Sequence, residues 1–239
     1  MVESGFTAPR PAQLRRFGRV FYPAGLRLQK ALSAYVSEEG RPDQLVILEH
    51  DPVFTLGRNA TPADIHVSDD FLASQGVGVH RTDRGGEVTY HGPGQIVAYP
   101  LLDLRRLGLG VRELVQRIEQ AIIDTLDVWN VVALRRAGAP GVYVGAAKIA
   151  ALGLRVRRGC TFHGLAFNVA MDLEPFGRIN PCGFHGLAVT QLSDIGGPSR
   201  LADVEDVLIG HLCRQFGLRA EAASPILPVP ATAAPIPVP

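Results

Sequence analysis

The sequence predicts a mixed α+β domain in which a largely antiparallel sheet is flanked by helices. Short β-type runs alternate with helical patterns along the chain, and several apolar runs follow one another with only glycine, proline or Arg-Arg pairs between them. No repeat at solenoid spacing is present. The 239 residues suffice for one domain with a core of its own.

Three segments have the spacing of apolar residues that is typical of a helix. The first begins at Pro23, a residue suited to the first helical position, and continues to Gly40. The clearest covers residues 111–129, where apolar residues recur every three to four positions. The last covers residues 203–216 and again has one apolar face. We expect these helices to pack on the sheet.

Most of the remaining chain has the character of β-strands. Residues 45–48 are apolar throughout, which is typical of a strand buried on both faces. Residues 77–82 and 87–90 flank Gly85-Gly86 and are expected to form a hairpin. Further strands are expected at residues 95–104, 131–134, 141–145, 147–156 and 162–171.

Composition excludes several classes of protein. With 46% apolar and 20% charged residues the chain is neither disordered nor collagen-like nor a coiled coil. A formal net charge of +1 gives no overall attraction for nucleic acid or an anionic membrane. Three cysteines, an odd number, argue against a secreted disulfide scaffold, and no signal sequence is apparent. We therefore expect a soluble cytoplasmic protein with neither nucleic acid nor membrane as partner.

Residues 84–95, R-G-G-E-V-T-Y-H-G-P-G-Q, form the densest motif in the chain. Two adjacent glycines allow the backbone to approach a ligand closely and leave its amide donors unobstructed. Arg84 can bind a carboxyl, phosphate or thioester-linked group, and His91 can donate or accept a hydrogen bond at neutral pH. A tight hairpin followed by a turn with an incidental histidine explains the same residues equally well.

Lys148 is the only ionisable residue of a small and apolar stretch at residues 141–153. Because burial of an ammonium group is costly, such a lysine is expected to be paired or functional. The alternative is an edge-strand lysine that extends to water. His163 begins a second stretch of small residues, 163–169, whose small side chains would leave room for a narrow ligand. Alternatively, His163 is a structural histidine of the core or of a turn.

Cys182 lies in the turn Asn180-Pro-Cys-Gly, between a proline and a glycine. A lone cysteine is more often an inert small apolar residue. A neighbouring ammonium group would lower the pKa of this thiol and make it a nucleophile. A thiol of pKa ~8.5 is only about 3% thiolate at pH 7, whereas a thiol of pKa ~6.5 is roughly three-quarters thiolate. Cys182 and Lys148 would then form a nucleophile and base for acyl transfer. Cys160 and His163 supply only two soft ligands, so no metal site is expected.

These motifs together resemble one family, the lipoyl(octanoyl) transferases. Residues 84–99 match the signature R-G-G-x-x-T-[aromatic]-H-x-x-G-Q-x-[aliphatic]-x-Y at every fixed position. The stretches that begin at Lys148, His163 and Asn180 match further family motifs in the same order. The similarity extends from about residue 14 to residue 216.

The resemblance implies the fold of the catalytic domain of biotin and lipoate protein ligases. It implies transfer of an octanoyl group from octanoyl-acyl carrier protein to a lysine of lipoyl-domain proteins, without cofactor or metal. No sequence feature marks the oligomeric state, and we expect a monomer. Cys182 would carry the acyl thioester and Lys148 would lower its pKa. The substrate site would be lined by Arg84, Gly85, Gly86, Glu87, Val88, Thr89, Tyr90, His91, Ala151, Leu152, Gly153, His163, Gly164, Leu165 and Ala166.

The expected organisation is a flexible leader at residues 1–13, a single catalytic domain at 14–220 and a Pro/Ala-rich tail at 221–239. A small C-terminal subdomain is expected from about residue 185. Backbone amides near Cys182 or at Gly85-Gly86 are candidates for stabilising the oxyanion. Four arginine doublets are candidates for meeting an acidic carrier protein: Arg15-Arg16, Arg105-Arg106, Arg135-Arg136 and Arg157-Arg158.

Three other functions remain open at this point. An ATP-dependent lipoate or biotin ligase would need no cysteine. An amidotransferase that moves octanoyl groups between lipoyl-domain proteins would differ in its preferred donor. A non-catalytic module that binds a carrier protein would not become acylated.

Overall fold

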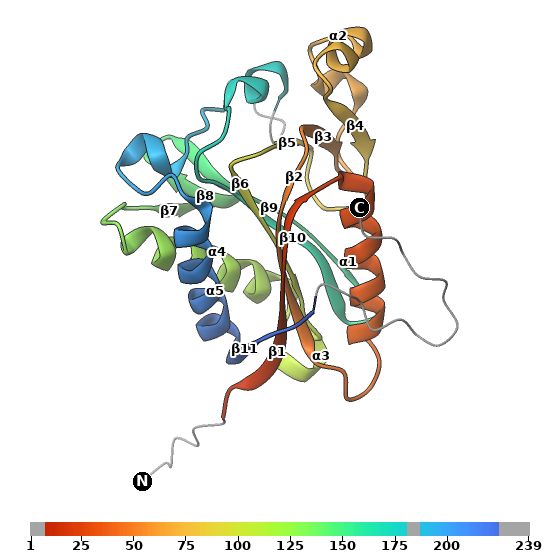
Figure 1. Ribbon diagram of the computed structural model, residues 1–239, viewed down its shortest axis with the longest axis vertical. Helices are drawn as coiled ribbons and strands as arrows, with labels where there is room; N and C mark the ends of the chain where they lie inside the picture. Colours follow the sequence, from red (N-terminus) through yellow and green to blue (C-terminus); the bar gives the residue numbers. More distant parts are fainter. Residues whose placement is uncertain (1–7, 181–186, 225–239) are drawn as a thin grey trace.

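The computed structural model describes residues 8–180 and 187–224. Within these residues the strands form one large sheet and one small sheet, with helices on both faces of the large one (Figure 1). The strands are β1 (Arg10–Val20), β2 (Asp43–His50), β3 (Val53–Leu56), β4 (Gly78–Arg81), β5 (Val88–His91), β6 (Gln95–Leu101), β7 (Leu134–Arg136), β8 (Ala139–Val144), β9 (Ala147–Arg157), β10 (Cys160–Asn168) and β11 (Leu218–Ala222). The helices are α1 (Tyr22–Val36), α2 (Asp69–Ser74), α3 (Leu104–Leu107), α4 (Val111–Asp127) and α5 (Leu201–Phe216).

The large sheet has the strand order β11-β1-β2-β6-β10-β9-β8-β7 in the described part of the chain. β1 runs parallel to both β11 and β2, and the remaining neighbours are antiparallel. The sheet is therefore mixed and largely antiparallel, which confirms the predicted fold class.

Two apolar cores lie on opposite faces of this sheet. Helices α4 and α5 cover one face, where Ile118, Leu208 and Phe167 belong to one buried cluster. Helix α1 covers the other face, where Leu32 packs with residues of β2, β6 and β10 (Figure 1). Because α5 shares its core with α4, the described residues from 187 onward form no separate subdomain.

The small sheet corrects one expectation from the sequence. β4 and β5 were expected to form a hairpin, but β3 lies between them, parallel to β4 and antiparallel to β5. The hairpin prediction is wrong because the backbone of β3 pairs with β4 and β5 in place of their pairing with each other; the Arg84 guanidinium, on the loop between β4 and β5, also binds Thr55 of β3. Strand β3 itself was not predicted.

The predicted helices at residues 111–129 and 203–216 are confirmed as α4 and α5, and the first predicted helix as α1. The leader was expected to extend through residue 13, but β1 already begins at Arg10. Its backbone pairs on one side with β11 and on the other with β2, which orders it. At the other end, β11 extends two residues into the expected tail, to Ala222.

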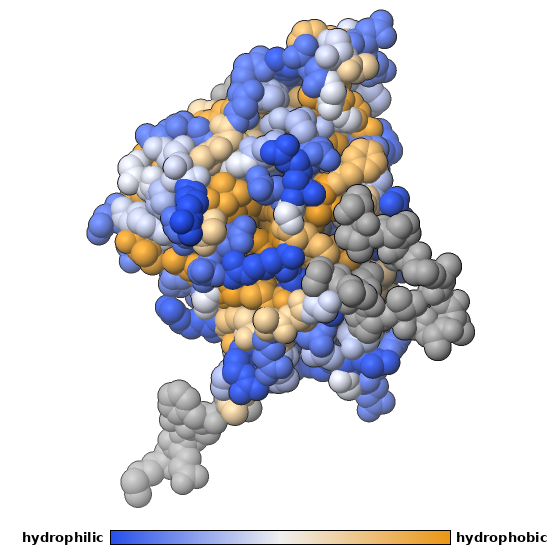
Figure 2. Space-filling model, viewed as in Figure 1, coloured by the Kyte–Doolittle hydropathy of each residue, from blue (hydrophilic) through white to orange (hydrophobic). Residues whose placement is uncertain are grey.

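The surface is mixed in character. On the face shown in Figure 2, hydrophilic residues dominate the periphery and apolar residues gather in the middle, between α4–α5 and α1. Among the described residues no helix has the length and apolar character that crossing a bilayer demands.

Candidate active site

A pocket of about 500 Å³ lies where the loop before β5 meets β9, β10 and the start of α4. Lys148 and fourteen of the fifteen predicted substrate-site residues line it, so stretches far apart in sequence meet at one place. Tyr90 is the exception. Its ring packs in a third buried apolar cluster, next to the small sheet. The ring centroid lies 5.3 Å from that of Phe54 and 5.6 Å from that of Phe176.

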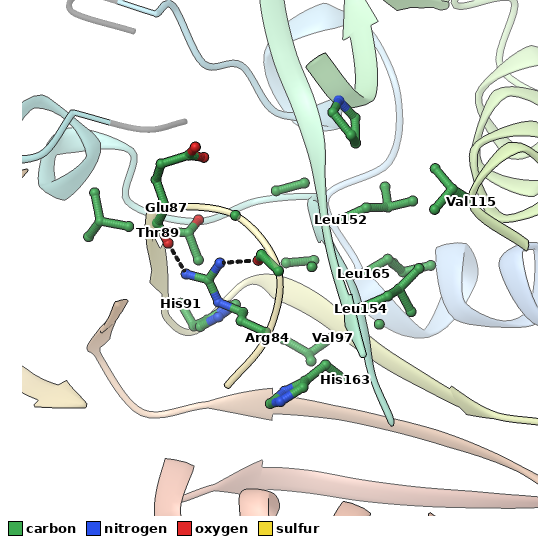
Figure 3. A pocket seen from close by; sticks show the side chains of 18 of the residues that line it. Arg84, Glu87, Thr89, His91, Val97, Val115, Leu152, Leu154, His163 and Leu165 are labelled. Atoms are coloured by element: carbon green, nitrogen blue, oxygen red, sulfur yellow. Dashed lines mark hydrogen bonds between the residues drawn. The ribbon is translucent and has the colours of Figure 1, made fainter. Parts of the chain in front are cut away.

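The lining of the pocket is polar on one side of β9 and apolar on the other (Figure 3). Arg84, Thr89 and His91 lie on the polar side. Val115 of α4 lies with Leu152, Leu154 and Leu165 on the apolar side. The pocket thus offers separate surfaces to a hydrocarbon chain and to a polar group.

Arg84 is buried, and its guanidinium shapes the loop that carries it. The Nη2 group donates to the Thr55 carbonyl at 2.6 Å and to the Glu87 carbonyl at 2.7 Å, and Nη1 donates to the Gly85 carbonyl at 3.0 Å (Figure 3). The Gly85 amide donates to the Leu154 carbonyl at 3.1 Å. The Gly85 N–H is therefore already hydrogen-bonded within the chain, and the Gly86 N–H and the amides near Cys182 stay the predicted donors to an oxyanion.

Two buried histidines, His91 in the pocket wall and His50 beside it, are neutral over the physiological range. Burial, together with the nearby His50, lowers the pKa of His91 to about 3, although its Nδ1 lies 2.8 Å from Gln95 Oε1. Burial lowers the pKa of His50 to about 4. His50 is fixed between the Val20 carbonyl, 2.7 Å from Nδ1, and the Tyr99 hydroxyl, 2.6 Å from Nε2.

Lys148 is buried in the pocket wall, with only 4% of its surface exposed. Its Nζ donates to the Pro140 carbonyl at 3.2 Å and lies 5.2 Å from the centre of the Tyr143 ring. Its backbone is also held: the Lys148 amide donates to the Ala188 carbonyl, and the Lys148 carbonyl accepts from Thr190. The chain that follows Cys182 in sequence thus returns to Lys148 at residues 188–190.

Cys182 itself lies outside the described residues, as do Pro181 and Gly183. The two described cysteines are unpaired, and burial raises the pKa of both Cys160 and Cys213. Neither is therefore an activated thiol. No group of three or more metal-ligating side chains is found among residues 8–180 and 187–224.

Several lining residues were missed at the level of sequence. Tyr22, Val97, Val115 and Leu154 come from α1, β6, α4 and β9. Apolar residues on predicted helices and strands carry no signal that separates a pocket wall from a core. Asp83 was also missed, although it directly precedes Arg84; its carboxylate lies 3.0 Å from His163 Nε2.

Most of the arginine doublets are bound within the chain. Arg16 pairs with Glu205, Arg106 with Asp43 and Arg135 with Glu119. The doublet Arg157-Arg158, at the turn between β9 and β10, is exposed, and no ion pair is found for it among the described residues.

Comparison with known proteins places the chain in a family. Residues 22–213 match the lipoyl protein ligase A/B catalytic domain, so the chain belongs to that family. Within it, the chain is 57% identical over 231 residues to a protein of Xanthomonas axonopodis pv. citri named octanoyltransferase, covering 95% of this chain and 96% of the relative. It is 55% identical over 208 residues to an octanoyltransferase of Xylella fastidiosa, covering 87% of each chain.

Solved structures agree on the fold. Lipoate-protein ligase A bound with ATP covers 90% of each chain with a TM-score of 0.70 at 17% identity. An archaeal bipartite lipoate protein ligase from Thermoplasma acidophilum has a TM-score of 0.72 at 16% identity and covers 91% of this chain and 87% of its own. The expected likeness to the catalytic domain of lipoate protein ligases is confirmed.

Proposed function

We propose that this chain is a cytoplasmic acyltransferase that moves an octanoyl group from octanoyl-acyl carrier protein to a lysine of lipoyl-domain proteins. One observation carries the proposal: a buried lysine lies in the wall of a half-apolar pocket, in a chain 57% identical to proteins named octanoyltransferase. Identity to the ATP-bound ligase is only 17%. Acyl transfer is therefore favoured over an ATP-dependent ligase.

The apolar side of the pocket suits the hydrocarbon part of the substrate. Val115, Leu152 and Leu165 present methyl groups there. Burial of each methylene group of an eight-carbon chain contributes up to ~0.8 kcal/mol. The polar side is left for the carrier arm or the acceptor lysine, which bear groups that form hydrogen bonds.

The reaction proceeds through Cys182 in two steps. Its thiolate attacks the thioester carbonyl of the donor, the C–S bond to the carrier breaks, and the carrier leaves as a thiolate that takes up the proton of the Lys148 ammonium. The amine of the acceptor lysine then attacks the octanoyl-Cys182 thioester, forms the amide and releases the Cys182 thiolate. Lys148, when neutral, accepts the proton that the attacking amine loses. Because a thioester is exchanged for an amide, no ATP is consumed.

Lys148 supports this role through its surroundings. Nearly all of its surface is removed from water, and its Nζ donates to the Pro140 carbonyl. A lysine side chain can release and accept a proton during a reaction, which an arginine cannot do. The thiol at Cys182 gains thiolate character wherever an ammonium group is near it.

The partners follow from the reaction. Acyl carrier proteins are acidic as a class, and Arg157-Arg158 is the doublet whose guanidinium groups no described ion pair occupies. We expect this turn to contribute to docking of the donor and the enzyme to act as a monomer. Charge reversal of both arginines should raise the KM for octanoyl-carrier and weaken its dependence on salt. An unchanged KM at every salt concentration would exclude this docking role.

Mass spectrometry of the intact protein tests the function directly. Incubation with octanoyl-acyl carrier protein and no acceptor should add the mass of one octanoyl group to the wild type and none to Cys182→Ser. Addition of a lipoyl domain should then move that mass to the acceptor. A parallel incubation with free octanoate and ATP detects a ligase. Transfer of the octanoyl mass in that incubation alone would overturn the proposal.

A further inference from the structure

We propose that Asp83 is a positioning residue, which fixes the tautomer of His163 and ties the loop of residues 83–87 to β9 and β10. The inference rests on the proposed function in one respect: this loop and His163 form part of the wall of the substrate pocket.

Asp83 is bound by side chains from three different elements. Its Oδ1 lies 3.0 Å from His163 Nε2 on β10 and 4.0 Å from Lys30 Nζ on α1. Its Oδ2 lies 3.6 Å from Arg155 Nε on β9. Arg155 also donates through Nη1 to the Asp83 backbone carbonyl at 3.1 Å. One residue thus joins a helix and two strands at the base of the loop.

The backbone of His163 is in a conformation that side chains other than glycine rarely adopt. Its φ is 59°, in the left-handed region, although the residue is buried within β10. The Gln29 side chain accepts a hydrogen bond from the His163 amide. Left-handed residues in buried places persist only where their neighbours hold them, and they cluster at functional sites. Here Gln29 holds the backbone of His163, and Asp83 holds its ring.

The bond to Asp83 decides which ring nitrogen carries the proton. Burial holds His163 neutral, with a pKa of about 4, so the ring has a single N–H. The Asp83 carboxylate can only accept, and that N–H must therefore be at Nε2. Nδ1 is left as an acceptor, and no described side chain or backbone group donates to it. His163 can therefore accept a hydrogen bond from an amide N–H or hydroxyl of a ligand on the polar side of the pocket.

The same residue governs the position of the loop. Asp83 is followed by Arg84 and Gly85, and the Gly85 amide donates to Leu154 next to Arg155 in β9. A Cβ at Gly153 would lie 3.0 Å from Arg84 Cδ and 3.1 Å from the Gly85 carbonyl, so the loop rests directly on the strand. Loss of the Asp83 carboxylate removes its contacts with Arg155 and His163, while the backbone hydrogen bond from Gly85 to Leu154 stays.

Three variants separate positioning from a general effect on folding. Asp83→Ala removes every acceptor, and Asp83→Asn keeps an oxygen for the His163 N–H but loses the charge that faces Lys30 and Arg155. Glu38→Gln is the matched control, because Glu38 forms an exposed ion pair with Arg41 away from the pocket. Where Asp83→Ala fails to fold, Asp83→Asn alone carries the comparison.

Three measurements report on the two parts of the proposal. The ¹⁵N shifts of the His163 ring should show the Nε2–H tautomer in the wild type and a mixture of tautomers in Asp83→Ala. Hydrogen exchange of the Gly85 amide should accelerate by about tenfold, as for loss of a charge-assisted bond. The KM for the octanoyl donor should rise by about tenfold while kcat changes less. Asp83→Asn should keep the tautomer but show part of the exchange and KM effects.

A pure Nε2–H tautomer and unchanged Gly85 exchange in Asp83→Ala would overturn the proposal, and so would equal effects in Glu38→Gln. A wild type that fails to transfer octanoyl groups would contradict the proposed function instead. The shifts and the exchange rates would still decide the role of Asp83, because neither requires a substrate.

Discussion

Arg84 and Thr55 are joined by three hydrogen bonds between buried groups. The Arg84 Nε and Nη2 groups donate to Thr55 Oγ1 at 3.2 and 3.0 Å, and Nη2 also donates to the Thr55 carbonyl at 2.6 Å. The arginine of the R-G-G motif therefore connects the loop to β3, and its guanidinium donates to several acceptors within the chain. Its role in binding the substrate stays a prediction.

Arg84→Lys should accordingly destabilise the protein. A lysine cannot reproduce the planar set of donors, so acceptors at Thr55, Gly85 and Glu87 lose the hydrogen bonds that the guanidinium donates. Each buried unsatisfied group costs about 1–3 kcal/mol, and we expect a loss of roughly 2–4 kcal/mol in the free energy of unfolding. Urea denaturation measures it. Arg58→Lys is the matched control, because Arg58 is exposed beside the same loop. Equal stability of the two variants would contradict the role of Arg84.

We predict that alanine substitutions at Gly164 and Gly210 have opposite effects on the stability of the protein. A Cβ at Gly164 would lie 2.0 Å from the Ala98 carbonyl oxygen and 2.8 Å from Pro100 Cδ, so β6 and β10 could not keep their spacing. We expect Gly164→Ala to cost at least about 3 kcal/mol. Gly210 lies in helix α5 with no atom within 4 Å of a new Cβ, and Gly210→Ala should stabilise by about 0.5–1 kcal/mol. Thermal unfolding of both variants checks the contrast.

The sequence predicted the elements whose signal is local. Helix α4 has one apolar face that its residues alone define, and the strands from β7 to β10 are separated by turn residues. The match of spaced motifs also located Lys148 and fourteen other residues of the pocket wall, 15 of its 25 lining residues. These predictions succeeded because helical periodicity, turn chemistry and motif spacing can each be observed in one dimension.

What the sequence could not show depends on pairing between distant segments. Strand β3 has only four residues, and it forms its sheet by pairing with two later strands, β4 and β5, while Arg84 on the loop between them binds Thr55. β1 is ordered by β11, two hundred residues away, so its first residues were taken for a leader. Asp83 acts through three partners that are remote in sequence, and no local pattern marks it. Residues 181–186, which include Cys182, lie outside the described structure.

Lys148→Arg should separate the two steps of the proposed reaction. A guanidinium keeps the positive charge but does not release its proton, so it cannot accept one from the attacking amine. We expect octanoyl-enzyme to form and its transfer to the lipoyl domain to slow by about 10²–10⁴-fold, the usual contribution of general acid–base catalysis. Lys148→Met should impair both steps. Quenched-flow mass spectrometry of the enzyme and the acceptor measures each rate, and transfer at the wild-type rate in Lys148→Arg would exclude proton acceptance by Lys148.

His50 predicts how stability depends on pH. Burial lowers its pKa to about 4, whereas a histidine in an unfolded chain titrates near 6.5. Below pH 6.5 the unfolded state therefore binds a proton that the folded state does not, and the free energy of unfolding falls as pH decreases towards 4. Above pH 6.5 both states are neutral and His50 contributes no pH dependence. Between pH 7.5 and 4.5 the loss from this one residue amounts to roughly 2–3 kcal/mol.

His50→Gln should reduce that loss, because glutamine does not titrate. At pH 7.5 the variant should be less stable than the wild type, since it disturbs the hydrogen bonds to the Val20 carbonyl and the Tyr99 hydroxyl. The deficit should shrink by roughly 2 kcal/mol at pH 4.5, where the unfolded wild type gains its proton. Urea denaturation at both pH values gives the two differences. A deficit that stays constant across this range would mean that His50 takes up its proton as readily in the folded protein as in the unfolded chain.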